Sequence, residues 1–301
     1  MKNLWVQADS NKRRSAFLVF FFVIIVVALG WLFSYVYNSP LILIIAVAIA
    51  LTQSLVGYYS GDKIILATSG AREIVKKDNP ELWTIVENIS ITSGLPMPKV
   101  YIIPEVAPNA FATGRDPEHA SIAVTAGLLE RLNKNELAGV IAHEMSHVGN
   151  FDIRLMTITA VLVGVIAVVS DLFLRSRFFG FGRSRDDNNS GQLMAIVGTI
   201  AAILAPIVAM LIQLAISRKR EFLADADGAL LTRYPDGLAS ALEKISQYSE
   251  PVEHVSSATA HLYISNPLGG EDEKEQSFFA KIFATHPPIK ERIKALRDMS
   301  F

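Results

Sequence analysis

The sequence predicts a mainly helical α+β protein with four transmembrane helices, two at the N-terminus and two inserted into the polar part of the chain. Three observations support this fold class. Hydrophobic residues occupy 51% of the 301 positions, and many of them fall in four long runs. A helix that spans a bilayer takes about 20 mostly apolar residues, which is the approximate length of each run. The remaining polar stretches carry helix signals together with short β-like segments.

The four apolar runs differ in their polar content. They extend over Ala16–Tyr37, Leu41–Tyr59, Leu155–Leu174 and Leu193–Ile216. The first two contain no charged residue, whereas the third contains Asp171 and the fourth contains Gln213. A buried helix of a soluble protein is the alternative for each run, and for the last two it stays open, as does an incomplete crossing of the bilayer. The first run is about twice as long as the core of a secretory signal, so we expect a retained anchor.

The runs divide the chain into four predicted parts. These are a membrane anchor at 1–59, a polar part at 60–152, a transmembrane hairpin at 153–216 and a second polar part at 217–301. Because two spans separate the polar parts, both are expected on the same side of the membrane. Ten Lys and Arg near the span ends share the side of the N-terminus, against four in the loop between the third and fourth runs. This bias favours cytoplasmic termini, although the four arginines oppose it.

Composition narrows the chemistry that the chain can perform. It contains no cysteine, which excludes disulfides, thiolate metal sites and cysteine nucleophiles. Its net charge of −1 gives no indication of nucleic-acid binding. A metal ion would have to be held by His, Asp or Glu, and the chain has six histidines.

The polar parts contain recognisable element boundaries. Asn79 is a typical N-cap for a helix from Pro80 to about Ser93, and Gly94 ends it. Asn133 and Glu136 have the spacing of a capping box, which predicts a helix that begins after Asn133 and continues past His147. Short β-like runs are expected at Lys99–Ile103 and Ala120–Thr125, and further helices at Lys219–Leu231, Tyr234–Ser246 and Ile289–Arg297.

A metal-binding pattern lies inside the helix that follows Asn133. Its residues are His143, Glu144 and His147, in the order His-Glu-Met-Ser-His. Residues four apart lie one helical turn above each other, so both imidazoles face the same side and can share one ion. Glu144 lies beside them, where a carboxylate can accept a proton from a water on the metal. A pair of surface histidines is the alternative reading of this motif taken alone.

A third ligand is available downstream. A catalytic zinc ion usually has three protein ligands and one open position, and Glu221 can supply the third ligand. Asp225 follows one turn later and is suited to fix a histidine tautomer by hydrogen bonding. The hairpin formed by the third and fourth runs returns the chain to the side that it left near His147, so the predicted topology brings Glu221 to the histidines.

These motifs together resemble the HtpX family of membrane-bound zinc metallopeptidases, which is related more distantly to the CAAX prenyl proteases. The resemblance implies a gluzincin-like fold, one Zn²⁺ per chain, an active site on the cytoplasmic side of the cell inner membrane and polypeptide substrates. It also implies a role in the quality control of misfolded membrane proteins. The similarity extends over nearly the whole chain and is carried by the paired N-terminal runs, Asn109–Gly114, Val124–Leu129, His143–His147, Glu221–Asp225, His261–Leu268 and Thr285–Pro288.

Two further sets of residues are expected in the active site, one that binds the substrate and one that stabilises the transition state. The alternating segment Asn109–Gly114 is compatible with an edge strand or an ordinary loop, and peptides often bind by adding a strand to such an edge. The predicted substrate-binding residues are therefore Asn109, Ala110, Phe111 and Ala112. By resemblance, His286 would stabilise the oxyanion of the transition state, with Arg292 in support; taken alone, His286 would be read as a capping residue.

The predicted function is metal-assisted peptide hydrolysis by a zinc metalloendopeptidase, with Glu144 as general base. One rival is a membrane transporter or scaffold with structural zinc, which intramembrane Gln53, Asp171 and Gln213 would support. Structural zinc is usually closed by a fourth protein ligand, and Glu144 would have no role in such a site. A second rival is a prenyl-protein endopeptidase, for which more than four spans would be expected.

Overall fold

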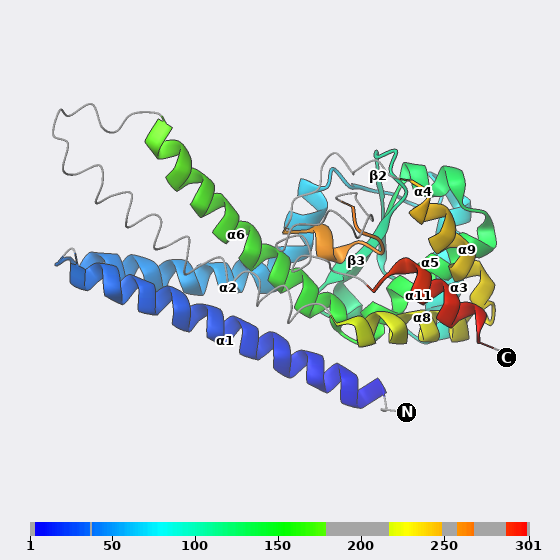
Figure 1. Cartoon of the computed structure of the whole chain (residues 1–301), viewed down its shortest axis with the longest axis horizontal. Helices are drawn as coiled ribbons and strands as arrows, with labels where there is room; N and C mark the ends of the chain where they lie inside the picture. Colours follow the sequence, from blue (N-terminus) through cyan, green and yellow to red (C-terminus); the bar gives the residue numbers. More distant parts are fainter. Residues whose placement is uncertain (1–3, 37, 179–216, 249–257, 268–286, 300–301) are drawn as a thin grey trace.

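Two long helices, α1 (Leu4–Val36) and α2 (Pro40–Thr68), pack against each other and extend away from an α+β domain (Figure 1). The computed structural model describes residues 4–36, 38–178, 217–248, 258–267 and 287–299. By length and composition, 8–35 of α1 and 40–68 of α2 can each cross a membrane. Only 17% and 11% of their most apolar parts are buried, which argues against core helices of a soluble protein.

The second helix also belongs to the polar domain. It begins at Pro40, whose fixed φ suits the first helical position, and it continues past Tyr59, where the apolar run ends. Its last turns bury Ile65 and Leu66 against the domain. The anchor and the domain are therefore joined by one continuous helix.

A four-stranded sheet forms the centre of the domain, in the order β1-β2-β4-β3. Its strands are β1 (Arg72–Glu73), β2 (Lys99–Ile103), β3 (Ala110–Gly114) and β4 (Ala120–Thr125). The β2–β4 pair is parallel, and the other two pairs are antiparallel. The two predicted β-like runs are confirmed as β2 and β4. The alternating segment after Asn109 is confirmed as an edge strand, β3.

Both faces of the sheet are covered, and the strands alternate between two cores. One face carries Ala112 and Ile122 into a large cluster with α3 (Pro80–Ser93) and α5 (Lys134–Gly149). The opposite face carries Phe111 and Ala123 into a cluster with the end of α2 and the start of α6 (Asp152–Phe178). The end of α2 and the start of α6 thus supply part of the core of the domain.

The predicted helix ends in this layer are confirmed. The Asn79 side chain accepts a hydrogen bond from the Leu82 N–H, and Gly94 adopts a left-handed φ of 69° that ends α3. At α5, Asn133 and Glu136 form a reciprocal capping box. Strand β1 and helix α4 (Ala126–Arg131), which is capped by the Thr125 side chain, are among the short elements that were not predicted from the sequence.

The remaining helices pack against α5 or against one another. They are α8 (Arg218–Thr232), α9 (Pro235–Ser246) and α11 (Ile289–Arg297), and they confirm the three helices expected in the second polar part. Glycines permit the closest approaches. A Cβ at Gly228 of α8 would lie 2.9 Å from the His143 nitrogen, and a Cβ at Gly139 of α5 would lie 2.7 Å from the Leu238 nitrogen. The single-turn helices η1 (Pro117–His119) and η2 (Ala260–Leu262) complete the described elements.

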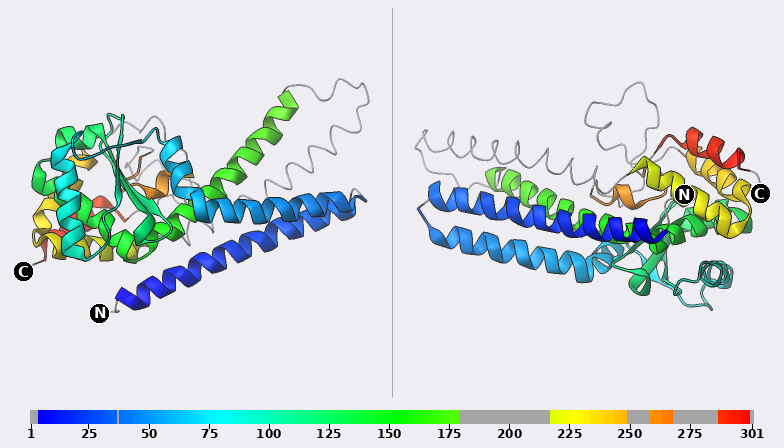
Figure 2. Two further views of the ribbon diagram at one scale, coloured as in Figure 1. Left: turned by 180° about the vertical axis from the view of Figure 1, so that it is seen from behind. Right: turned by 90° about the horizontal axis from the view of Figure 1, so that it is seen from below.

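The third apolar run lies on α6, whose first part packs against α1 and α2 before the helix extends away from the domain (Figure 2). Leu155, Ile158 and Leu162 of α6 pack on Leu18 and Phe22 of α1. The fourth run lies outside the described residues. The mainly helical α+β class and two candidate membrane helices are therefore established, while the four-span arrangement stays a prediction.

Candidate metal centre

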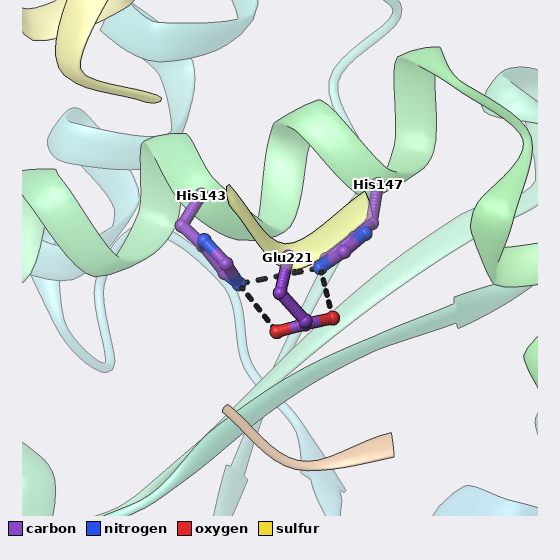
Figure 3. A group of neighbouring side chains, drawn as sticks. All are labelled: His143, His147 and Glu221. Atoms are coloured by element: carbon purple, nitrogen blue, oxygen red, sulfur yellow. Dashed lines mark hydrogen bonds and ion pairs between the residues drawn. The ribbon is translucent and has the colours of Figure 1, made fainter. Parts of the chain in front are cut away.

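The sequence motif assembles into a buried group of three potential metal ligands (Figure 3). His143 and His147 extend from the same side of α5, and Glu221 reaches them from the first turn of α8. The ligand atoms lie within 4.8 Å of one another, and all three residues are buried. Nε2 of His143 lies 3.2 Å from Nε2 of His147 and 3.9 Å from the Glu221 carboxylate. Nε2 of His147 lies 3.6 Å from that carboxylate.

These distances and donor types fit a tetrahedrally coordinated metal ion. Zinc bonds of about 2.0–2.2 Å place ligand atoms about 3.4 Å apart in a tetrahedron. With both rings neutral, the two Nε2 lone pairs face each other beside a carboxylate in a buried site. That arrangement is favourable only when positive charge lies between the three groups. The donor set therefore fits a divalent cation.

A carboxylate behind each imidazole fixes its orientation. Nδ1 of His143 lies 2.9 Å from Asp225 Oδ1, and Nδ1 of His147 lies 3.1 Å from Asp152 Oδ2. Because a carboxylate accepts hydrogen bonds, each Nδ1 carries the hydrogen and each Nε2 is left to bind a metal. The predicted role of Asp225 agrees with this geometry. Asp152 has the same role at the second histidine.

Asp225 is itself held by Arg292 from α11. The guanidinium donates two hydrogen bonds to the carboxylate, at 2.8 Å and 2.7 Å, and a third to the Ile264 carbonyl at 2.9 Å. Burial would raise the pKa of Asp225, but the charge and hydrogen bonds of Arg292 lower it to about 2. Arg292 has no exposed surface and lies 3.8 Å from Glu221, so it also holds positive charge beside that ligand.

The two histidines differ in their affinity for protons. Burial lowers the pKa of His143 to about 4, although the hydrogen bond to Asp225 opposes this shift. Burial would also lower the pKa of His147, but the hydrogen bond to Asp152 and the charge of Glu221 raise it to about 9. Positive charge is thus favoured at His147, and a metal ion bound there would take the place of a proton.

Glu144 is buried on the same helix, with an exposed fraction of 2%. Burial raises the pKa of its carboxyl to about 7, the charge of Glu221 raises it further, and the charge of His147 lowers it. The Ala112 backbone N–H donates a hydrogen bond to this carboxylate. The general base predicted from the motif therefore contacts the edge strand predicted to bind substrate.

The outer edge of β3 is already bonded at several positions. The Ala110 carbonyl accepts from the Ile264 N–H at 2.9 Å, and the Asn109 side chain donates to the Ser265 carbonyl at 3.1 Å. Phe111 points to the opposite face of the sheet, where it stacks edge-on with Tyr263. Among the four predicted substrate-binding residues, Ala112 lies next to Glu144, whereas Asn109 and Ala110 contact the segment after η2.

The structure describes only one of the two remaining predicted residues, His286 and Arg292. His286 lies outside the described residues, so its position relative to the histidines is not described. Arg292 contacts Asp225 and the region around His143, and its predicted support of His286 stays a prediction. Two further residues were not expected: Asp152, and Arg220, which donates to Asp152 Oδ1 at 3.1 Å. Asp152 lies beyond the end of α5, where helical spacing no longer indicates which side chains meet.

Comparison with known proteins agrees with this geometry. The family described as Peptidase family M48 matches residues 76–300. The protease HtpX homolog of Thermoanaerobacter pseudethanolicus is 46% identical over 303 residues, covering 99% of both chains. That of Tropheryma whipplei is 48% identical over 289 residues, covering 96% of both. These relatives confirm the resemblance indicated by the motifs.

A solved structure is similar in fold. Ste24p of S. mikatae superposes with a TM-score of 0.52 at 19% identity, and the match covers 98% of this chain and 67% of Ste24p. At this identity, the similarity concerns the fold alone.

Removal of Glu221 and removal of Asp225 are expected to weaken metal binding to different extents. Glu221→Ala deletes a ligand and should abolish stoichiometric metal. Asp225→Ala leaves the ligands but frees the His143 ring, which should lower affinity on the order of 10- to 100-fold. Metal content and chelator competition on the purified full-length protein measure both effects. The control is Asp236→Ala, which removes an exposed carboxylate on α9. Unchanged metal binding in Glu221→Ala would show that Glu221 is not a ligand.

Proposed function

Because the chain belongs to peptidase family M48, we propose that it is a zinc metalloendopeptidase of the membrane in which His143, His147 and Glu221 hold one Zn²⁺. The family and the two candidate membrane helices support a protease of the membrane. The observation that supports the metal most directly is the burial of the three ligand atoms within 4.8 Å of one another. Zinc is the ion commonly bound by two histidines and a carboxylate in hydrolases.

Glu144 would carry the proton during hydrolysis. When bound, zinc would acidify a water molecule and polarise the scissile carbonyl. Glu144 would accept the proton of the attacking water and pass it to the nitrogen of the leaving amine, while the carbon–nitrogen bond breaks. Glu144 is buried beside the three ligands, so it is placed to accept that proton, and its burial, which raises the pKa of its carboxyl, also favours holding the proton until it is released to the amine.

The edge strand β3 would align the substrate beside this base. A peptide that pairs with Ala112 would lie against the strand whose N–H contacts Glu144. Asn109 and Ala110 would contribute only if the segment around Ile264 and Ser265 exchanged its bonds for those of the substrate. This arrangement favours extended polypeptides, which agrees with a role in degrading misfolded membrane proteins.

Exchange of the base for its amide is the central test of this function. Glu144→Gln retains the three ligands, so it should bind metal stoichiometrically and lose about 10²- to 10⁴-fold of its peptidase activity. Activity is measured on an unfolded membrane protein after zinc loading in detergent. Activity near that of the unchanged protein, with metal still bound, would favour a structural metal instead.

His286 is proposed to stabilise the oxyanion on the basis of the Thr285–Pro288 motif. His286→Ala should lower kcat by roughly 10²- to 10³-fold and leave KM and zinc content nearly unchanged, as for other oxyanion donors. If His286 only caps a turn, the substitution lowers thermal stability instead and preserves the specific activity of the folded fraction. Measurements of kcat and Tm on the zinc-loaded variant separate these results.

We propose that four spans of the chain cross the inner membrane and that the active site and both termini lie in the cytoplasm. A reporter fused after Phe301 should then report the cytoplasm, and one inserted within 186–191 should report the opposite side. Protease accessibility or alkaline phosphatase activity in intact cells measures both fusions. A cytoplasmic signal from the inserted reporter would show that the third and fourth runs do not cross the membrane.

A further inference from the structure

A buried asparagine connects the first membrane helix to the metal centre. Asn11 lies on α1 shortly before the apolar run begins, and only 2% of its surface is exposed. Its side-chain nitrogen donates to the Asn150 carbonyl and to Asp152 Oδ1, both at 2.8 Å. A primary amide has two hydrogens on this nitrogen, so these contacts use its full donor capacity.

The carboxylate that receives this bond is the one behind His147. Oδ2 of Asp152 lies 3.1 Å from Nδ1 of His147, and Oδ1 accepts from Arg220 at 3.1 Å as well as from Asn11. Asp152 therefore joins side chains from α1, α5 and α8. Because Oδ1 is held from two directions, rotation of the carboxylate away from the histidine would break both bonds.

The same part of α1 also contacts the turn between α5 and α6, which precedes Asp152. Phe151, between α5 and α6, has a φ of +58°, a left-handed conformation that bulky side chains rarely adopt. Such a conformation persists where its surroundings fix it. Asn11 binds the Asn150 carbonyl on one side of this residue, and the Lys12 ammonium lies 4.2 Å from the centre of the Phe151 ring.

We propose that Asn11 is a positioning residue of the metal centre, which holds Asp152 and through it the ring of His147. The first membrane helix is then a part of the metal site rather than only an anchor. The inference rests on the proposed function, in which His143, His147 and Glu221 bind zinc. A chain whose α1 is not docked would retain all three ligands but bind the ion weakly, so metal loading would depend on assembly of the membrane helices.

Metal affinity of the full-length protein in detergent tests this role. Asn11→Ala removes both donors, and Asn11→Asp keeps the shape but places a second carboxylate beside Asp152. We expect the Kd for Zn²⁺, from chelator competition, to rise about 10- to 100-fold in both variants. The d–d absorption of the Co²⁺-loaded protein should also change, because the ring of His147 reorients. Ser15→Ala is the matched control: this buried hydroxyl of α1 donates to the Asn11 carbonyl within its own helix, and its Kd should stay within twofold.

A double-mutant cycle distinguishes positioning from a general loss of packing. If Asn11 acts through Asp152, Asn11→Ala should have little further effect on the Kd in an Asp152→Ala background, so the two changes are not additive. Additive effects, or an unchanged Kd in folded Asn11→Ala, would overturn the proposal. The Tm of each variant, measured without metal, shows which variants are folded. Asn11→Ser keeps one hydrogen-bond donor and replaces any variant that does not fold. Failure of the unchanged protein to bind Zn²⁺ would instead refute the proposed function, and the inference with it.

Discussion

The bond between each metal-facing imidazole and a buried carboxylate is the interaction on which the centre depends. Asp225 and Asp152 decide which nitrogen of each ring is free, and each of these buried carboxylates is paired with a cationic side chain that offsets the cost of its burial. Arg292 supplies that partner for Asp225, and Arg220 supplies it for Asp152. The two guanidinium groups come from α11 and α8, so the geometry around the ligands requires the complete domain.

Close helix packing brings the ligands to one point. Glu221 meets the histidines because α8 approaches α5 at Gly228, where a larger residue would press on the backbone of His143. The edge strand β3 lies on the same helix, and its Ala112 N–H reaches Glu144. The sheet therefore connects Glu144, the proposed general base, to the strand on which a peptide is proposed to lie.

Local signals predicted most of the elements, the proposed ligands and Asp225 behind His143, but not the contacts that hold His147. Asn133 and Glu136 fixed the start of α5, and the four-residue spacing of His143 and His147 fixed their common side. Glu221 was proposed because the predicted membrane topology returns the chain to the side that it left near His147. Asp152 and Asn11 were not predictable, since their contacts depend on the turn at Phe151 and on how α1 docks, and neither leaves a periodic pattern. Strand β1 was missed because two residues are too few to show alternation.

The division of the ligands between two distant parts of the chain has a consequence for biosynthesis. A ribosome that has completed α5 has made both histidines and Glu144, but Glu221 follows only after the whole of α6 and the fourth apolar run. Two imidazoles on a helix bind a divalent ion far more weakly than a closed three-ligand site. The nascent chain therefore emerges without a competent metal centre. The proposed hydrolytic chemistry would therefore become available only after Glu221 has been made, and the Arg292 contact that holds Asp225 would form later still.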